Sequence, residues 1–276
     1  YHIQNGNQTS GGDSGDFCYI RQKIEGQNIA SSGWNYLSAS SYITVSFWIK
    51  SSVAFNSLCY AQTYSGTDYS YPFETGNLSA NTWTKITKTI PGNSNLVFDA
   101  DNAQGFLITW GMYWGSDFTD NSTSLNTWAA YNSSQRLPDM ASTWWTTNDA
   151  TFEVTGVQLE VSDHATDFEH RSYAQELQLC KRYYEQFIPQ LYVLARYSHN
   201  SGSVNNWYFF EVEKRAAPTG SYSGTFSNGS GYAGNPQFSQ AKTRGIVIKG
   251  SNDADANGIK YLDNSGNATC KFDAEI

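Results

Sequence analysis

The sequence is poor in charge and in proline, and it contains no long apolar run. Charged residues make up 15% of its 276 positions and only six residues are proline, whereas 16% are aromatic. Disordered chains have the opposite balance, because they hold too few apolar side chains to offset the entropy lost on folding. No apolar run approaches the about 20 residues that a membrane-spanning helix needs. The sequence therefore predicts a folded protein that is not a membrane protein.

Basic residues are scarce and scattered. The chain has 17 lysines and arginines against 25 acidic residues, which gives a formal net charge of -8 and an isoelectric point near 4.9. Binding of nucleic acid needs a concentrated basic face that neutralises phosphates. The composition therefore argues against a nucleic-acid partner.

Cysteine is rare as well. Four cysteines are spread along the chain without a Cys-x-x-Cys pair: Cys18, Cys59, Cys180 and Cys270. We expect free, buried thiols instead of a zinc site or a dense disulfide scaffold. His164 and His170 lie six residues apart, a spacing that does not suit two metal ligands on one helix face. The sequence predicts no metal and no cofactor.

What the first part of the chain does contain is a repeated strand pattern. In one segment, Ile43, Val45, Phe47 and Ile49 alternate with polar residues, which places Trp48 on the opposite face. In another, every second residue from 106 to 114 is apolar, and we expect that face to be core. The period-two runs are 17–24, 43–50, 83–90, 106–114 and 152–161. No helical pattern separates them, which predicts an antiparallel β-sandwich.

The period changes between residues 152 and 187. The apolar frame slips by one residue at Gly156, as in a β-bulge. Ser172 and Gln175 then have the spacing of a capping box. Apolar positions follow at four-three intervals and predict a helix of about four turns: Tyr173, Leu177, Cys180, Tyr184 and Phe187.

Strand patterns return after the helix, at 190–198, 207–214, 243–249 and 268–276. The expected fold is therefore all-β, with a sandwich over 1–165, a helical joint over 166–188 and a distal β domain over 189–276. The distal domain is small and would leave strand edges open, which favours an oligomer. The helical face could form a short seam between copies, or simply pack against its own domain.

Three separated motifs occur along the chain. The first motif comprises Cys18-Tyr-Ile-Arg-Gln-Lys-Ile-Glu-Gly26 and Thr44-Val-Ser-Phe-Trp-Ile-Lys-Ser51. The second comprises Gly156-Val-Gln-Leu-Glu-Val161, Thr166-Asp-Phe-Glu-His-Arg171 and Leu179-Cys-Lys-Arg-Tyr-Tyr184. The third comprises Phe210-Glu-Val-Glu-Lys-Arg-Ala-Ala-Pro-Thr219 and Phe272-Asp-Ala-Glu-Ile276. In this order, the motifs resemble those of bacteriophage tail-fibre and minor structural proteins that carry a jelly-roll domain similar to carbohydrate-binding modules.

The resemblance covers nearly the whole chain, whose start at Tyr1 instead of methionine indicates processing or a longer parent protein. It implies an N-terminal jelly roll, a distal β domain and a homotrimer. It also implies a place on the virion, in a tail fibre or similar appendage that contacts the bacterial surface. Other virion proteins and a host-surface glycan would then be its partners.

Aromatic residues are the candidates for binding such a glycan. Sugar rings present apolar C–H faces, which stack on exposed aromatic rings, and hydroxyls, which need neutral or acidic hydrogen-bonding groups. The candidate rings are Trp128, Tyr131, Trp144, Trp145, Tyr69, Tyr71 and Trp48. Adjacent Trp144 and Trp145 would point to opposite faces if they lay on a strand. The alternative for any of these rings is a place in the sandwich core.

The sequence gives little sign of catalysis. Gly12-Asp13-Ser14-Gly15 has no upstream domain to supply a base, and we interpret it as chance. Glu160 and Asp163 could form a glycosidase pair only at a separation that sequence does not determine. Asp99 and Asp101 could bind calcium, although a solvated turn is favoured. We expect no catalytic residue and no enzyme.

The predicted function is therefore adhesion to host-surface polysaccharide by a virion structural protein. One alternative is a polysaccharide depolymerase of the tail-spike type. Such enzymes resemble long repetitive β-helices, whereas no repeat is apparent in this sequence. The other alternative is a purely architectural decoration of the capsid or tail.

Overall fold

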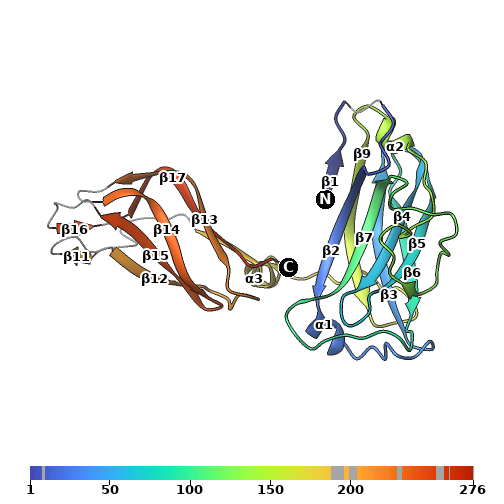
Figure 1. Cartoon of the computed structure of the whole chain (residues 1–276), viewed down its shortest axis with the longest axis horizontal. Helices are drawn as coiled ribbons and strands as arrows, with labels where there is room; N and C mark the ends of the chain where they lie inside the picture. Colours follow the sequence, from blue (N-terminus) through green and yellow to red (C-terminus); the bar gives the residue numbers. More distant parts are fainter. Residues whose placement is uncertain are drawn as a thin grey trace. The chain divides into compact units, whose positions relative to one another are not determined.

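The computed structural model describes residues 1–7, 10–187, 196–198, 204–228, 232–252, 258–260 and 262–275. Strands dominate the described part, and the predicted all-β class is confirmed. The chain divides into an N-terminal unit, Tyr1–Glu169, and a C-terminal unit, His170–Glu275 (Figure 1). The division falls close to the predicted end of the sandwich at 165, and the helical segment belongs to the C-terminal unit.

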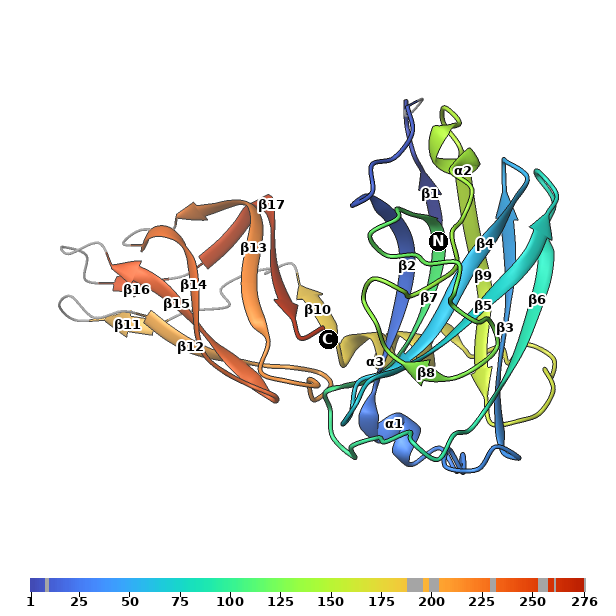
Figure 2. The ribbon, with the colours of Figure 1, turned by 45° about the vertical axis from the view of Figure 1, so that its right-hand side comes forward.

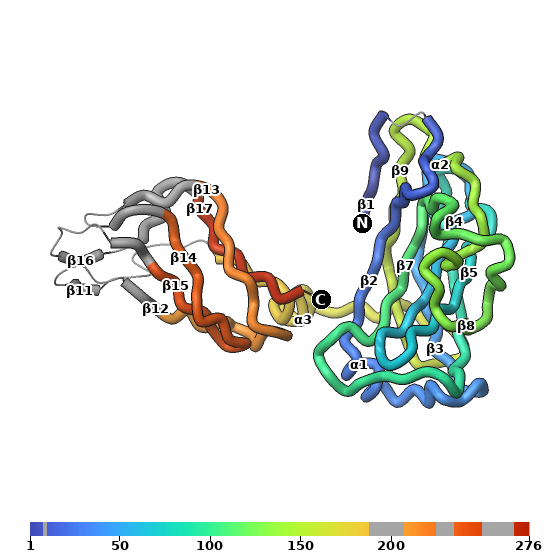
Figure 3. The backbone as a smooth tube through the Cα atoms, viewed as in Figure 1, coloured from blue at the N-terminus to red at the C-terminus, as the bar shows by residue number. Residues whose placement is uncertain are grey.

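Two antiparallel sheets form the N-terminal unit (Figure 2). The first sheet has the order β1 (His2–Gln4), β9 (Thr151–Glu160), β3 (Tyr42–Ser51), β6 (Thr84–Pro91). The second sheet has the order β2 (Phe17–Glu25), β7 (Gln104–Trp114), β4 (Phe55–Thr63), β5 (Tyr69–Leu78), β8 (Ala129–Ala130). Strands β1 and β9, from the two ends of this unit, lie side by side (Figure 3). Two short helices, α1 (Gly26–Ala30) and α2 (Thr143–Thr146), lie in its connections.

The main core lies between the two sheets. The predicted inner face of β3 is confirmed, since Ile43, Val45, Phe47 and Ile49 are each at most 2% exposed. The ring of Phe47 meets that of Trp110, on β7 of the second sheet, edge to face with centroids 5.5 Å apart. Burial of each such side chain contributes about 1.5–3 kcal/mol to the free energy of folding, so this row of four stabilises the packing of the two sheets.

Gly156 forms the predicted bulge in β9. Ser46 pairs with Gln158 and Trp48 with Thr155, so two residues of β9 lie opposite one residue of β3. Gly156 has a φ of +58°, a conformation that glycine adopts without the steric cost of a Cβ. The bulge shifts the alternation by one residue and keeps apolar side chains inward on both sides of it.

The outer face of the second sheet is partly covered by the connection over residues 115–142 (Figure 2). Leu137 from this connection is fully buried against Tyr60 and Trp114. The sequence placed Trp114 on the inner face with Phe106, and this was wrong. The pairing of β2 with β7 shifts register between Cys18 and Tyr19, and after this shift the Trp114 indole points to the outer face. Strands β4 and β5 escaped prediction because a largely buried strand shows no apolar–polar alternation.

Helix α3 (Tyr173–Lys181) begins with the predicted capping box, in which Ser172 and Gln175 bond reciprocally. It is shorter than predicted. Tyr184 and Phe187 lie on strand β10 (Tyr184–Phe187), which pairs with a distant strand near the end of the chain. The five-residue helical seam expected from the sequence is therefore not formed. Long-range strand pairing, which local spacing does not reveal, ends the helix.

The described residues of the C-terminal unit form three small antiparallel sheets. Their orders are β10-β17-β13, β12-β15-β14 and β11-β16. The further strands are β11 (Arg196–Ser198), β12 (Val204–Phe209), β13 (Thr219–Asn228), β14 (Tyr232–Lys242), β15 (Gly245–Asn252), β16 (Gly258–Lys260) and β17 (Leu262–Asp273). Ile246, Ile248 and Phe272 lie in its core. The predicted strand over 190–198 falls mostly outside the described residues.

Candidate carbohydrate-binding surface

The predicted aromatic residues do not gather into one site. Trp144 is fully buried, and its indole N–H donates to the Thr151 carbonyl at 3.1 Å, so its nomination as a ligand contact was wrong. Trp145 is half-buried with its ring 5.0 Å from that of Tyr113. The two tryptophans lie on helix α2 and not on a strand, and the start of β9 fixes Trp144 inward.

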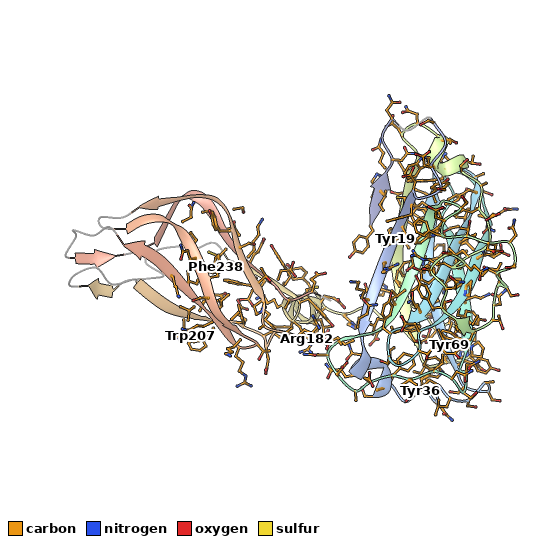
Figure 4. All side chains as sticks on the ribbon, in the orientation of Figure 1. Tyr19, Tyr36, Tyr69, Arg182, Trp207 and Phe238 are labelled. Carbon is orange, nitrogen blue, oxygen red and sulfur yellow. The ribbon has the colours of Figure 1, made fainter. Side chains whose placement is uncertain are left out.

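Trp128, Tyr71 and Tyr69 belong to the edge of the main core. Tyr71 is only 4% exposed and its ring lies 5.3 Å from that of Trp128. The Trp128 indole donates to the Pro91 carbonyl at 2.7 Å. Tyr69 is half-buried beside them (Figure 4). The nomination of Tyr71 is therefore corrected, and Trp128 is held in place by packing.

Tyr131 lies on the other side of strand β8 from Trp128. Tyr69 pairs with Ala130, and the backbone N–H of Tyr131 donates to the Asp68 carbonyl at 2.8 Å. Alternation across β8 thus sends Trp128 toward the core and Tyr131 toward the outer face of the second sheet. The proximity in sequence of these two rings does not place them in one site.

Tyr131 joins a group that we call the tyrosine–arginine face, defined as Tyr19, Arg21, Tyr64, Tyr131 and Arg136. All five residues are half-buried or exposed. The Arg136 guanidinium lies 5.9 Å from the ring centre of Tyr131. Burial raises the pKa of Tyr64, and the positive charge of Arg21 opposes that rise. Tyr19 belongs to the same face because its ring lies 4.5 Å from the Arg21 guanidinium. The face thus combines three ring systems with two cations.

Rigid strands hold the β2 side of this face. Arg21 Nε donates to Thr109 Oγ1 at 3.1 Å, and a terminal nitrogen donates to the Tyr60 hydroxyl at 2.7 Å. Thr109 lies on β7, directly between Arg21 on β2 and Tyr60 on β4. Tyr19 stacks on the Trp114 indole with the ring planes only 7° apart. These contacts fix the directions of Tyr19 and Arg21.

Arg136 comes from the connection that covers the sheet. Its guanidinium lies 4.7 Å from the ring centre of Phe118, 5.3 Å from that of Trp114 and 5.9 Å from that of Tyr131. Such cation–π contacts hold the planar group against the rings. Burial raises the pKa of Tyr131, and the positive charge of Arg136 opposes that rise.

A polar pocket of about 230 Å³ is lined by the sequence neighbours of Tyr131 and Arg136. Its walls carry hydroxyl and amide side chains from β5 and the covering connection: Ser70, Ser122, Thr123, Ser124, Thr127, Asn132 and Gln135. Gln135 Nε2 donates to Asp120 Oδ2 at 2.8 Å, which braces one wall. Because the pocket is smaller than the about 300–1,000 Å³ of sites for drug-sized ligands, it suits a single small polar ring.

Two tryptophans lie on the outer face of the first sheet. Trp48 points outward as the alternation predicted, with 42% of its surface exposed. Trp83, which the sequence did not single out, is equally exposed at 42%. Lys50 lies 5.1 Å from the ring centre of Trp83 and pairs with Glu153. This face offers flat rings without an accompanying pocket among the described cavities.

The C-terminal unit exposes a further pair of rings on edge strand β12. Trp207, labelled in Figure 4, is 42% exposed and Phe209 is 71% exposed. Their ring centroids lie 6.3 Å apart with the planes within 19°. Gly245 on β15 lies close to this pair, since an added Cβ would be in van der Waals contact with both rings at 3.4 Å and too close to the Tyr208 carbonyl oxygen at 2.8 Å. The sequence predicted a strand over 207–214, whereas the observed strand ends at Phe209. Trp207 and Phe209 occupy alternate positions in the part where the two agree.

Residues considered for metal or thiol chemistry have other roles. Asp101 Oδ1 accepts from the backbone N–H of Ala103 at 3.0 Å within its own turn. The described part of the chain holds no group of three or more histidine, cysteine or acidic residues placed to bind a metal. All four cysteines are free thiols; Cys59 and Cys270 are buried as predicted, whereas Cys180 is exposed.

The carboxylate considered for glycosidase chemistry is engaged in local structure. Glu160 accepts from the backbone N–H of Thr166 at 2.9 Å and from the Thr166 hydroxyl at 2.8 Å. Its neighbour Asp163 bonds His164 at 2.7 Å on the surface. These contacts tie down the segment that follows β9.

Most of the tyrosine–arginine face was missed by sequence reasoning. Tyr19 and Arg21 occupy alternate positions of the predicted strand 17–24, so their shared face was accessible from the pattern. Tyr64 and Arg136 carried no such signal, because their places depend on the path of the connections.

Comparison with models of known protein families finds no match. Comparison with curated proteins finds no relative. None of the helices in the described ranges is long and apolar enough to span a membrane.

Proposed function

We propose that this chain is a virion structural protein, part of a tail fibre or similar appendage, that adheres to host-surface polysaccharide without acting on it chemically. The observation that carries the proposal is the outer face of the second sheet. There Tyr131 is half-buried and Tyr64 is 37% exposed, and the two residues that flank Tyr131 in the sequence line a pocket rich in hydroxyls and amides. This is the combination that a sugar requires, since its C–H faces stack on rings and its hydroxyls need neutral partners.

The strand order supports a jelly-roll module as the scaffold. With the two-residue edge strand β8 left aside, the sheets have the orders β1-β9-β3-β6 and β2-β7-β4-β5. Apart from the β4–β5 hairpin, successive strands cross from one sheet to the other, and edge strands β1 and β2 pair with the late strands β9 and β7. Two nested Greek keys of this kind define a jelly roll.

The proposed assembly is a homotrimer that uses the exposed surface of α3. All residues from Tyr173 to Cys180 are exposed, including Leu177 at 36% and Leu179 at 50%. A shallow, open depression runs along the helix and is lined by Arg171, Ala174, Gln175, Gln178 and Leu179. Apolar surface of this kind favours contact with other copies. Three copies would also raise the effective concentration of weak sugar sites.

The test of adhesion is binding of the full chain to a glycan array and to host cells, with Tyr64→Ala and Tyr131→Ala as variants. Each variant is expected to weaken binding at least about fivefold, because one stacked ring contributes about 1 kcal/mol or more. Tyr222→Ala is the matched control, since Tyr222 is 40% exposed and Tyr64 is 37% exposed. Release of reducing ends from a bound polysaccharide would contradict pure adhesion and support a depolymerase. Absence of any binding by an intact oligomer would overturn the proposal in favour of an architectural role.

A further inference from the structure

The tyrosine–arginine face holds two cations without an acidic partner in the described part of the chain. Arg21 and Arg136 make their contacts with hydroxyl groups and aromatic rings. Elsewhere in the described residues Arg171 pairs with Glu176 and Arg244 with Glu213, each at 3.2 Å. In a protein with a formal net charge of -8, two such guanidiniums on one face require an explanation.

Arg21 is oriented by its neighbours but not neutralised by them. Its Nε and one terminal nitrogen donate to Thr109 and Tyr60, which are uncharged acceptors. A guanidinium has five N–H groups in a planar fork, so part of its donor capacity remains available. Tyr60 is fully buried, and its hydroxyl therefore holds the cation in a fixed position at the sheet surface.

Arg136 lies in a weakly polar environment. Three rings surround its guanidinium, and its Nε is buried without a hydrogen-bond partner. Attraction between charges is stronger where water is partly excluded. The two guanidiniums lie on one stack of rings, because Arg136 contacts Trp114 and Trp114 stacks on Tyr19. Arg21 in turn lies against Tyr19.

We propose that the tyrosine–arginine face binds the carboxylate of an acidic sugar, with Arg21 and Arg136 as its cationic contacts and Tyr131 beside Arg136. This inference rests on the proposed function and specifies its substrate class. Planar guanidiniums bind carboxylates through paired, charge-assisted hydrogen bonds. The sugar ring would lie against the rings of Tyr64 or Tyr131, with its hydroxyls directed to the polar pocket.

The carboxylate of Asp68, close to Tyr64, allows a test in which a substitution should strengthen binding. Asp68 Oδ2 accepts from Gln62 Nε2 at 3.4 Å, and Asp68 is electrostatically coupled to Tyr64. Burial raises the pKa of Asp68. Its negative charge would repel an acidic ligand, so Asp68→Asn is expected to strengthen binding. A purely structural role for the arginines predicts no such gain.

The experiment measures binding of the full chain to four carboxylated polysaccharides: polygalacturonate, alginate, hyaluronan and polysialic acid. Dextran is the neutral comparison, carboxyl-reduced forms of the bound polymers test the charge, and dextran sulfate tests another anionic group. Binding is expected to at least one carboxylated polymer and to fall about tenfold after carboxyl reduction. It is also expected to weaken as salt rises, because about 1 M salt shortens the screening length to about 3 Å.

Arg21→Gln and Arg136→Gln are each expected to weaken this binding about tenfold, the size of effect that a charged hydrogen bond supplies. Arg136→Lys keeps the charge without the planar fork and should retain part of the binding even where glutamine disturbs the packing. Arg244→Gln is the control, because it removes an equal charge from an exposed pair in the C-terminal unit.

The outcomes separate this inference from the adhesion proposal. Binding to neutral glycans, with no effect of the Arg21 and Arg136 variants, would overturn the acidic specificity and leave adhesion standing. Preference for dextran sulfate over every carboxylated polymer would replace the carboxylate by a sulfate. Absence of binding to all glycans, acidic and neutral, would overturn both proposals.

Discussion

Lys214 and Glu185 form an ion pair of 2.7 Å in which neither side chain is more than 2% exposed. The pair sits in the C-terminal unit, where Glu185 lies on strand β10. The Tyr208 hydroxyl donates to the second oxygen of Glu185 at 2.6 Å, and Lys214 also donates to the Lys181 carbonyl at the end of α3. A buried charge network of this kind joins the helix, β10 and β12 in one arrangement.

Removing one charge of this pair should strongly destabilise the C-terminal unit. Glu185→Gln leaves Lys214 charged, buried and without a compensating anion, which costs about 3–5 kcal/mol. Chemical denaturation should show the loss, and hydrogen exchange should locate it in β10 and β17. The double variant Glu185→Gln with Lys214→Met should recover part of the stability, because no unpaired charge remains.

The control for this prediction is Glu213→Gln, which breaks the exposed pair with Arg244. Solvent screens that pair, so little or no change is expected. Equal effects of Glu185→Gln and Glu213→Gln would contradict the assignment of the buried pair as an organising contact.

Truncation of the adjacent residues Phe47 and Trp48 should cost very different amounts of stability. Phe47 is fully buried between the sheets, and Phe47→Ala should cost about 3–5 kcal/mol through lost burial and an unfilled cavity. Trp48 is 42% exposed on the outer face, and Trp48→Ala should cost far less. Thermal unfolding of the two variants measures the difference. A larger loss for Trp48→Ala would mean that the alternation of β3 is inverted.

This alternation is the part of the fold that sequence predicts well. Strands with one apolar and one polar face, such as β3, show their period in the sequence. The slip of that period at Gly156 is visible in the same way. Trp144 shows the limit, because its burial depends on a one-turn helix held by distant residues. Phe187 shows the same limit, since only pairing with β17 makes it part of a strand. The tyrosine–arginine face needs both kinds of information, as Arg21 follows the period and Arg136 follows the path of a connection.

Substitution of Gly156 should strain the bulge. With a φ of +58°, an alanine there costs about 1–2 kcal/mol, and its Cβ would lie 3.3 Å from Trp48 Cδ1. Gly76→Ala is the matched control, because Gly76 has a φ of +73° and no heavy atom within 4 Å of the added Cβ. Both variants should lose stability by denaturation, but only Gly156→Ala should change the fluorescence of Trp48, measured against a Trp48→Phe background. A fluorescence change in both variants would argue against a local contact.

The exposed leucine of α3 should control assembly. Leu177→Glu introduces a charge on the helix surface assigned to contact between copies, and the mass in solution should fall from that of a trimer to that of a monomer. Leu37→Glu is the control, because Leu37 is 53% exposed in the N-terminal unit and lies outside the proposed contact. Analytical ultracentrifugation distinguishes the species. A wild-type monomer at all concentrations would overturn the proposed trimer.

Cys180 offers an independent readout of the same surface. It is exposed on α3, whereas burial raises the pKa of the Cys59 and Cys270 thiols to about 12. Only a thiolate reacts quickly with a maleimide, so at about pH 8 the two buried thiols should stay protonated and unreactive in the folded chain. Burial also raises the pKa of Cys18, which should react slowly. Cys180 should therefore carry the fast phase, and Cys180→Ser should abolish it.

If α3 lies between copies, this fast phase of labelling should slow as protein concentration rises and return in Leu177→Glu. A labelling rate that is independent of concentration in both proteins would place the contact elsewhere.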